Sequence, residues 1–183
     1  MTVTTFRVPP PAATDARDRP WSRPAPRADD VRVLADRVAG GRIHDARWRA
    51  TAAARLAMVA TDHPELLGDP VVRRLNAALP RLLRGGDTGE VGALVALCAA
   101  LGDRLSCAVC PALQGLVREA DVRLAVAAHV ASLVVEGLTP SAQHLADLAA
   151  AADVDPRSLG PGYGRPLHAR AAVLAYALTV GDG

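Results

Sequence analysis

Two cysteines three positions apart are the residues of this sequence best suited to chemistry. Cys107 and Cys110 stand in the segment SCAVCP, and the only other cysteine is Cys98. A CxxC spacing brings two sulfur atoms close enough to form a small-loop disulfide. At a helix N-terminus the backbone amides and the helix dipole favour the thiolate, which attacks disulfides or peroxides. Pro111 predicts that a helix begins here, because its missing amide suits the first turn.

The pair therefore predicts a dithiol redox centre, in which Cys107 is the attacking thiolate and Cys110 resolves the mixed disulfide. Two other interpretations stay open, namely a chance pairing in a buried turn and metal ligation. Zinc requires four ligands, and the sequence holds neither a second CxxC nor an HxxxH to complete them. No cofactor and no metal are predicted. Cys98 lies in an apolar stretch and is expected in the core.

His129 is the histidine whose position is informative. It interrupts the apolar run LAVAAHVASLVV, so it would be a proton shuttle for a thiol if its helix packs against the CxxC helix. The alternative is a core or interface histidine bonded to a backbone carbonyl. The chain contains no lysine, which excludes Schiff-base chemistry, and no phosphate-binding glycine motif.

The composition predicts an all-α fold that would position these groups. Hydrophobic residues make up 50% of the chain and aromatic residues only 3%, while about a fifth of the residues are alanine. We expect one domain over residues 29–183, a bundle of seven or eight helices, after a flexible proline-rich arm at 1–28.

Local signals place the helices. Residues 29–40 read as a first helix that ends at a glycine pair, and 45–60 as a second in which Trp48, Ala52 and Leu56 share the apolar face. A third begins at Asp69-Pro70 and is kinked or split by Pro80. Asp87 and Glu90 resemble a capping box for a fourth. The helix from Pro111 is expected to continue past position 119 into the His129 segment. Thr139-Pro140 would open the next helix, and residues 168–180 form the last.

Two stretches resemble the alkylhydroperoxidase D-like, carboxymuconolactone decarboxylase superfamily. AAHVASLVVEGLTPSAQHLADLA is similar to the helix-turn-helix that follows the family's histidine, and LHARAAVLAYALTV to the helix with which many members end. The resemblance implies a small helical oligomer with thiol-dependent, peroxidase-like activity. In the peroxidase branch a glutamate precedes the CxxC, and a histidine follows the second cysteine by four residues.

Neither alignment of that motif retains the whole relay. With His129 as the family histidine, the cysteine positions fall on Val122 and Ala125. With Cys107 and Cys110 as the pair, the histidine position is Gln114 and the glutamate position is Val95.

Charge and hydropathy constrain location and partners. The 21 arginines nearly balance 19 acidic residues, so nucleic-acid binding is not expected. No apolar run approaches the length of a membrane helix, and the N-terminus lacks a signal-peptide pattern, which predicts a cytoplasmic protein with reduced cysteines. Few aromatics bury little area, so a homo-oligomer is expected, acting on a thiol or another small molecule.

A second function would need no thiol chemistry. In this interpretation the chain is an interaction scaffold, or it binds or converts a small apolar metabolite in an alanine-lined pocket between helices. His129 and either Tyr163 or Tyr176 would then be its few polar groups. The discriminating property is whether the CxxC is exposed.

Overall fold

The protein is all-α in a computed structural model that describes residues 26–40, 46–119, 121–154 and 167–180. Among these residues there are eight α-helices and no strand, as the composition predicts. The helices are α1 (Ala28–Ala39), α2 (Ala46–Asp62), α3 (Asp69–Gly85), α4 (Thr88–Leu101), α5 (Cys110–Leu116), α6 (Val122–Val135), α7 (Ala142–Ala151) and α8 (Leu167–Thr179). Short 3₁₀ turns lie at η2 (Pro64–Leu66), η3 (Gly102–Arg104) and η4 (Cys107–Val109).

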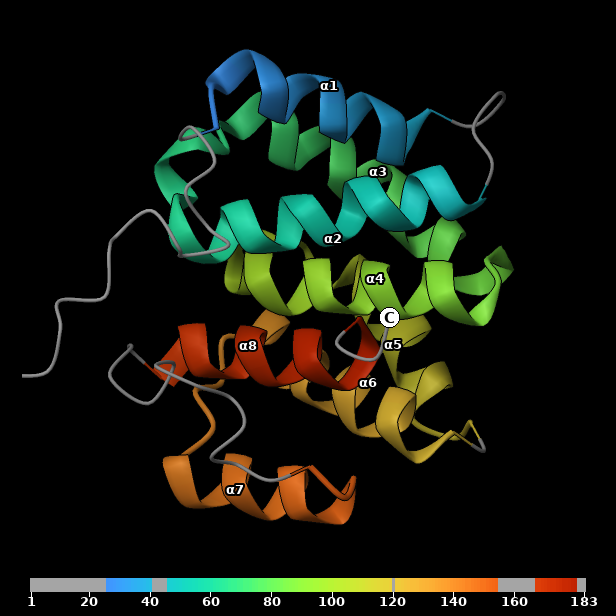
Figure 1. The fold of residues 1–183 in the computed structure, drawn as a ribbon, viewed down its shortest axis with the longest axis vertical. Coiled ribbons are helices and arrows are strands. Elements are labelled where there is room, and N and C mark those ends of the chain that lie inside the picture. Colours follow the sequence, from blue (N-terminus) through green and yellow to red (C-terminus); the bar gives the residue numbers. More distant parts are fainter. Residues whose placement is uncertain (1–25, 41–45, 120, 155–166, 181–183) are drawn as a thin grey trace, which may run out of the picture.

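Helix α4 forms the centre of the bundle. It packs mainly against α2 on one side and α8 on the other, with α6 and α3 completing its surroundings (Figure 1). Apolar residues surround its axis on every side, as expected of a fully enclosed helix. Gly92 brings α8 close, because a Cβ at this position would lie 3.1 Å from the Cβ of Thr179. The two helices therefore pack backbone to backbone along their alanine faces.

The layers of the bundle follow from these contacts. Helix α1 packs against both α2 and α3, whereas α6 packs against α4 and α8 from the other side and α5 packs against α6 (Figure 1). Helix α7 lies at the far edge and buries only Leu145 and Ala149. No helix in the described part of the chain is both long and apolar enough to cross a membrane. Most of the proposed arm at 1–28 lies outside the described residues, from 1 to 25.

Several local predictions are confirmed. Helix α1 ends before Gly40, α4 begins after Asp87, and the Asp87 carboxylate accepts a hydrogen bond from the Glu90 amide at 2.8 Å. The second half of the expected capping box is absent, because the Glu90 side chain turns away to meet Arg49. The predicted last helix is present as α8.

Other local predictions are wrong. Helix α3 is not split at Pro80 but continues through it, and Leu79, Leu82 and Leu83 next to the proline are buried in the core. Trp48 does not share the buried face of α2, and 60% of it is exposed.

The long helix expected from Pro111 is in fact two helices. The Asp121 side chain accepts hydrogen bonds from the Arg123 and Leu124 amides, and so α6 begins anew. A side chain that caps a helix in this way stops the preceding helix from continuing through it. Helix α7 is likewise capped by Ser141 rather than by Thr139.

Candidate functional site

The CxxC segment folds into two consecutive helical turns. Cys107 opens the 3₁₀ turn η4, and Cys110 is the first residue of α5, with Pro111 in its first turn as predicted. Ser106 precedes the pair as the N-cap residue of η4. The segment packs against α3 and α6, so both sulfurs lie where three elements meet.

The two cysteines have opposite environments. Cys107 is exposed, whereas Cys110 is buried with 6% of its surface accessible. Burial raises the pKa of the Cys110 thiol, and the neighbouring Cys107, the Glu136 carboxylate and a hydrogen bond with Cys107 raise it further. Although Cys110 begins a helix, burial and negative neighbours outweigh the favourable helix dipole. The geometry thus presents one accessible sulfur and one that is held back as a thiol.

Cys98 lies beneath this pair. It is completely buried on α4, as expected for a core cysteine, and burial together with the nearby Cys110 raises its pKa. Cys107 thus acts electrostatically on Cys110 and Cys110 on Cys98, and burial increases in the same order. Among the described residues, no group of three or more His, Cys, Asp or Glu side chains is arranged to hold a metal ion.

Glu136 is a member of the site that the sequence analysis missed. It follows the last residue of α6, and its carboxylate accepts a hydrogen bond of 3.2 Å from the Ser132 hydroxyl one turn earlier. Its proximity to Cys110 arises from the packing of α5 on α6. The spacing of Ser132 and Glu136 was visible in the sequence, but the identity of the facing helix was not.

Asn76 on α3 is a second such residue. Its side-chain oxygen accepts a hydrogen bond of 2.8 Å from the Ser106 amide, and its side-chain nitrogen lies 3.4 Å from the Arg104 carbonyl oxygen. One amide side chain thus joins both ends of the loop that enters the CxxC turn. Because Ser106 is the N-cap of η4, this contact positions the backbone directly before Cys107.

The side chain of His129 contacts helix α7. Its ring meets that of His144 on α7, with centroids 6.1 Å apart in an edge-to-face arrangement. It is not among the groups that shift the pKa of Cys110. Glu136, by contrast, is one of the groups that raise the pKa of Cys110.

The tyrosines of the alternative interpretation also lie apart from the pair. Tyr176 donates a hydrogen bond to the sulfur of Met58 at 3.6 Å, and burial raises the pKa of its hydroxyl. Tyr163 lies outside the described residues.

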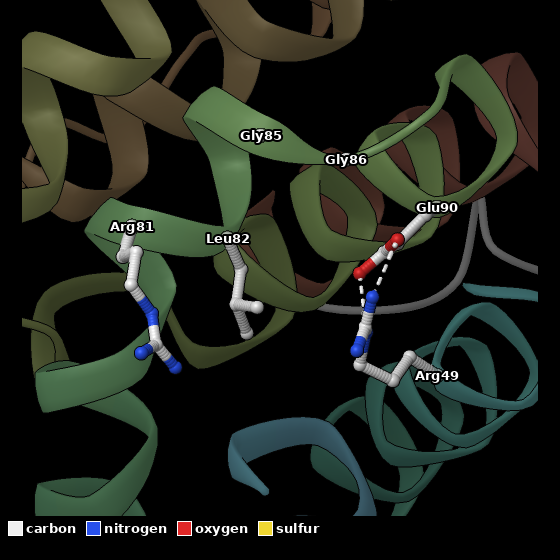
Figure 2. A pocket seen from close by; sticks show the side chains of 6 residues that line it. All are labelled: Arg49, Arg81, Leu82, Gly85, Gly86 and Glu90. Atoms are coloured by element: carbon white, nitrogen blue, oxygen red, sulfur yellow. Dashed lines mark hydrogen bonds and ion pairs between the residues drawn. The ribbon is translucent and has the colours of Figure 1, made fainter. Parts of the chain in front are cut away.

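Two cavities open away from the cysteines. The first, of about 290 Å³, lies between α2, α3 and α4 and is lined by Arg49, Arg81, Leu82, Gly85, Gly86 and Glu90. Figure 2 shows Arg49 crossing from α2 to meet Glu90, which is only 2% exposed, through two hydrogen bonds of 2.6 and 3.2 Å. Such a bidentate pair offsets the cost of burying the carboxylate. The pairing with Arg49 therefore explains why the Glu90 carboxylate is buried, and we assign Glu90 a structural role.

The second cavity is larger, about 390 Å³, and lies between the ends of several helices. Alanine is the commonest residue in its wall, in line with the alternative interpretation, but neither His129 nor Tyr176 lines it. Its lining residues are Ala60, Thr61, Pro64, Ala99, Ala100, Leu101, Gly102, Asp103, Arg104, Val134, Gly137, Leu138, Thr139, Ala169 and Ala172.

Comparison of the chain with family models, with curated proteins and with solved structures gives no match.

Proposed function

We propose that the protein is a thiol–disulfide oxidoreductase that uses Cys107 and Cys110. The observation that carries the proposal is the unequal burial of the pair, with Cys107 exposed and Cys110 6% accessible. An exchange centre needs one sulfur that a substrate can reach and a second that is protected until the mixed disulfide has formed.

The reaction is a two-step exchange. The Cys107 thiolate attacks one sulfur of a substrate disulfide, which breaks the substrate S–S bond, forms a mixed disulfide and releases the first substrate thiolate. Cys110 then loses its proton and attacks the Cys107 sulfur, releasing the second thiolate and leaving a Cys107–Cys110 disulfide. Two electrons pass from the dithiol to the substrate, and a second dithiol must reduce the protein again.

The surroundings of Cys110 support this order of events. Its raised pKa keeps it protonated while Cys107 reacts, which disfavours attack by the wrong sulfur. The interaction with Cys107 that helps to raise the pKa of Cys110 supports closure of a disulfide between the two residues. Glu136 places negative charge near Cys110, and we propose that its carboxylate accepts the Cys110 proton.

The resemblance to alkylhydroperoxidase D-like proteins suggests a hydroperoxide as a further oxidant. Cys107 would take the terminal oxygen, releasing an alcohol, and Cys110 would displace water from the sulfenic acid to close the disulfide. With Cys107 and Cys110 as the family pair, Val95 and Gln114 occupy the relay positions, so Glu136 would supply the proton transfers. Disulfide exchange needs fewer of these groups and is the activity that we favour.

The test uses single cysteine variants and 5,5′-dithiobis(2-nitrobenzoate) as the probe disulfide. Cys110→Ser should accumulate a stable mixed disulfide at Cys107, whereas Cys107→Ser should form no adduct on the same timescale. Cys98→Ser is the matched control and should close its Cys107–Cys110 disulfide like the unmodified chain. Intact-mass spectrometry distinguishes the adduct from the closed disulfide. Thiols that react only after denaturation, or a Cys107→Ser chain that reacts at the original rate, would overturn the proposal.

A second candidate function is the binding of a small molecule without redox chemistry. The specific observation in its favour is the alanine-lined cavity of about 390 Å³, which is within the size range of ligand sites. Alanine side chains leave space between closely packed helices while keeping the wall apolar. Binding that persists in the Cys107→Ser, Cys110→Ser chain would separate this function from thiol exchange.

We further propose that the chain works as a cytoplasmic homo-oligomer. Two exposed apolar side chains support an interface on the surface formed by α1 and α2, which pack together. Trp48 on α2 is 60% exposed, and Val33 on α1 is 50% exposed. Trp48→Glu should lower the subunit number in native mass spectra if this surface holds copies together. An unchanged subunit number, or a monomer in both chains, would contradict the interface.

A further inference from the structure

The segment 102–106 leads from the core helix α4 directly into the CxxC turn. Leu105 is buried with 4% of its surface accessible, and its amide donates to the Gly102 carbonyl at 3.0 Å. The next three residues, 106–108, are all exposed, so burial does not hold the chain at Cys107. A single 3₁₀ turn such as η4 is too short to be stable by itself. The position of Cys107 therefore depends on how the segment 102–106 is held.

The side chain of Arg104 attaches this segment to the turn between α2 and α3. Its two terminal nitrogens donate to the carbonyl oxygens of Pro64, at 3.1 Å, and of Leu67. Pro64 begins the 3₁₀ turn η2 and Leu67 is its C-cap residue, so the guanidinium group binds both ends of η2. Hydrogen bonds from a charged donor are roughly twice as strong as those between neutral groups. The planar guanidinium also fixes the direction of both bonds.

The backbone of Arg104 is held by a different element. The side-chain nitrogen of Asn76 on α3 lies 3.4 Å from the Arg104 carbonyl oxygen, and the side-chain oxygen of Asn76 accepts a hydrogen bond of 2.8 Å from the Ser106 amide. Arg104 is thus bound through its side chain to η2 and through its carbonyl to α3. These contacts together restrict the direction in which the chain enters the CxxC turn.

The second sulfur is positioned by other contacts. Cys110 is buried at the start of α5, and α5 packs against α6 and α3. A disulfide forms only when the two Cβ atoms approach to about 3.5–4.5 Å. Because Cys110 is held by the packing of α5, the separation of the two sulfurs depends on the contacts that hold Cys107.

We propose that Arg104 is a positioning residue for thiol exchange, which holds Cys107 within reach of Cys110 through the segment 102–106. The inference rests on the proposed thiol–disulfide exchange and adds a residue that acts on it through the backbone. The first step of the exchange needs only an accessible sulfur, whereas closure of the disulfide needs both sulfurs at a defined separation. Loss of the Arg104 side chain should therefore slow the second step and spare the first.

The experiment measures the two steps separately in the full chain. In a Cys110→Ser background, the rate of adduct formation with 5,5′-dithiobis(2-nitrobenzoate) reports the first step, and adding Arg104→Ala should change it by less than about twofold. With both cysteines present, release of the second thionitrobenzoate reports closure, which Arg104→Ala should slow roughly tenfold. Equilibration with glutathione and glutathione disulfide gives the effective concentration of one thiol toward the other, which should fall by about the same factor.

A conservative variant and a matched control separate positioning from a loss of stability. Arg104→Lys keeps the positive charge but loses the planar fork that binds two carbonyls, so its closure rate should lie between those of the unaltered chain and Arg104→Ala. It decides the matter if Arg104→Ala does not fold. Arg118→Ala removes an exposed arginine that follows α5 and should leave closure unchanged. Hydrogen exchange of the Ser106 amide should become faster in both Arg104 variants.

The outcomes distinguish this inference from the proposed function. Unchanged closure in both Arg104 variants, in chains whose Cys107 still forms its adduct, would overturn the role of Arg104 and leave thiol exchange in place. Lower stability with the original effective concentration would make Arg104 purely structural. Equal slowing of both steps would mean that Arg104 acts on the reactivity of Cys107 rather than on its position. If Cys107 forms no adduct in the unaltered chain, thiol exchange fails, and the role of Arg104 fails with it.

Discussion

Glu90 and Glu136 are two carboxylates in opposite situations. Glu90 is 2% exposed and held by Arg49 through two hydrogen bonds of 2.6 and 3.2 Å. Glu136 is exposed, accepts a hydrogen bond from the neutral Ser132 and has no cationic partner among the described residues. One charge is compensated within the fold, whereas the other is left to act on a thiol.

The difference shows how to separate a structural charge from a chemical one. A buried carboxylate with a matched arginine stabilises one packing arrangement, and its charge is unavailable to a substrate. An uncompensated carboxylate beside a sulfur changes the protonation of that sulfur, as Glu136 does when it raises the pKa of Cys110. The chemistry is therefore expected near Cys110, and the stability near Glu90.

The largest expected effect is a loss of stability when the Arg49–Glu90 pair is broken. Arg49→Ala leaves the Glu90 carboxylate buried without its bidentate partner, which should lower the free energy of unfolding by about 3–5 kcal/mol. Chemical denaturation followed by circular dichroism measures it. Arg84→Ala, an exposed position on α3, is the matched control and should change the free energy by less than about 0.5 kcal/mol.

Chemical denaturation of two glutamine variants compares the carboxylates of Glu90 and Glu136 directly. Glu90→Gln should be destabilising by more than about 1 kcal/mol, because the amide cannot accept both arginine hydrogen bonds. Glu136→Gln should be nearly neutral, since its side chain is exposed. Equal losses in the two variants would show that Glu136 is as structural as Glu90.

A smaller effect is expected at Asn76, which positions the backbone directly before Cys107. Asn76→Ala removes the acceptor for the Ser106 amide and should cost about 1 kcal/mol of stability. Hydrogen exchange of the Ser106 amide should become faster, and closure of the Cys107–Cys110 disulfide slower. Asn76→Asp keeps the acceptor oxygen and should restore the slow exchange. Unchanged exchange in Asn76→Ala would remove Asn76 from the positioning residues.

The smallest effect is a shift along the pH axis. Because the Glu136 carboxylate raises the pKa of Cys110, Glu136→Gln should lower that pKa, and the pH at which Cys110 is alkylated should fall. Site-resolved mass spectrometry of iodoacetamide labelling between pH 6 and 10 gives the profile. Glu119→Gln, an exposed glutamate that does not act on Cys110, should retain the original profile. A profile that moves to higher pH would have the wrong sign for this electrostatic contact.

Local chemistry made much of the fold predictable. The all-α class follows from alanine-rich composition, and the starts of α4 and α5 follow from Asp87 and Pro111. Each of these residues affects the backbone conformation only within a few positions along the chain. The split expected at Pro80 does not occur, because a proline ends a helix only where burial of its neighbours does not outweigh its cost, and Leu79 and Leu83 are buried.

The candidate site was half predictable for the same reason. Cys107 and Cys110 are recognisable by their spacing, and Cys98 by the apolar residues around it. Glu136 and Asn76 carry no such signal. Glu136 acts on Cys110 from the end of α6, and Asn76 binds the Ser106 amide from α3, in both cases across long separations in the sequence. His129 was placed beside the thiols on the assumption that its helix face points toward α5, but the face it presents meets α7.

The sequence by itself determined that this chain is helical, where most helices begin, and that two cysteines stand together at the start of one of them. These properties depend on backbone propensity, capping and spacing, which are local. The tertiary structure decided that Cys110 is buried while Cys107 is exposed, that Glu136 raises the pKa of Cys110 while His129 meets His144, and that the ends of several helices enclose an alanine-lined cavity. Burial and electrostatic contact depend on which helices pack together, and residues far apart in the chain settle that only when the core forms.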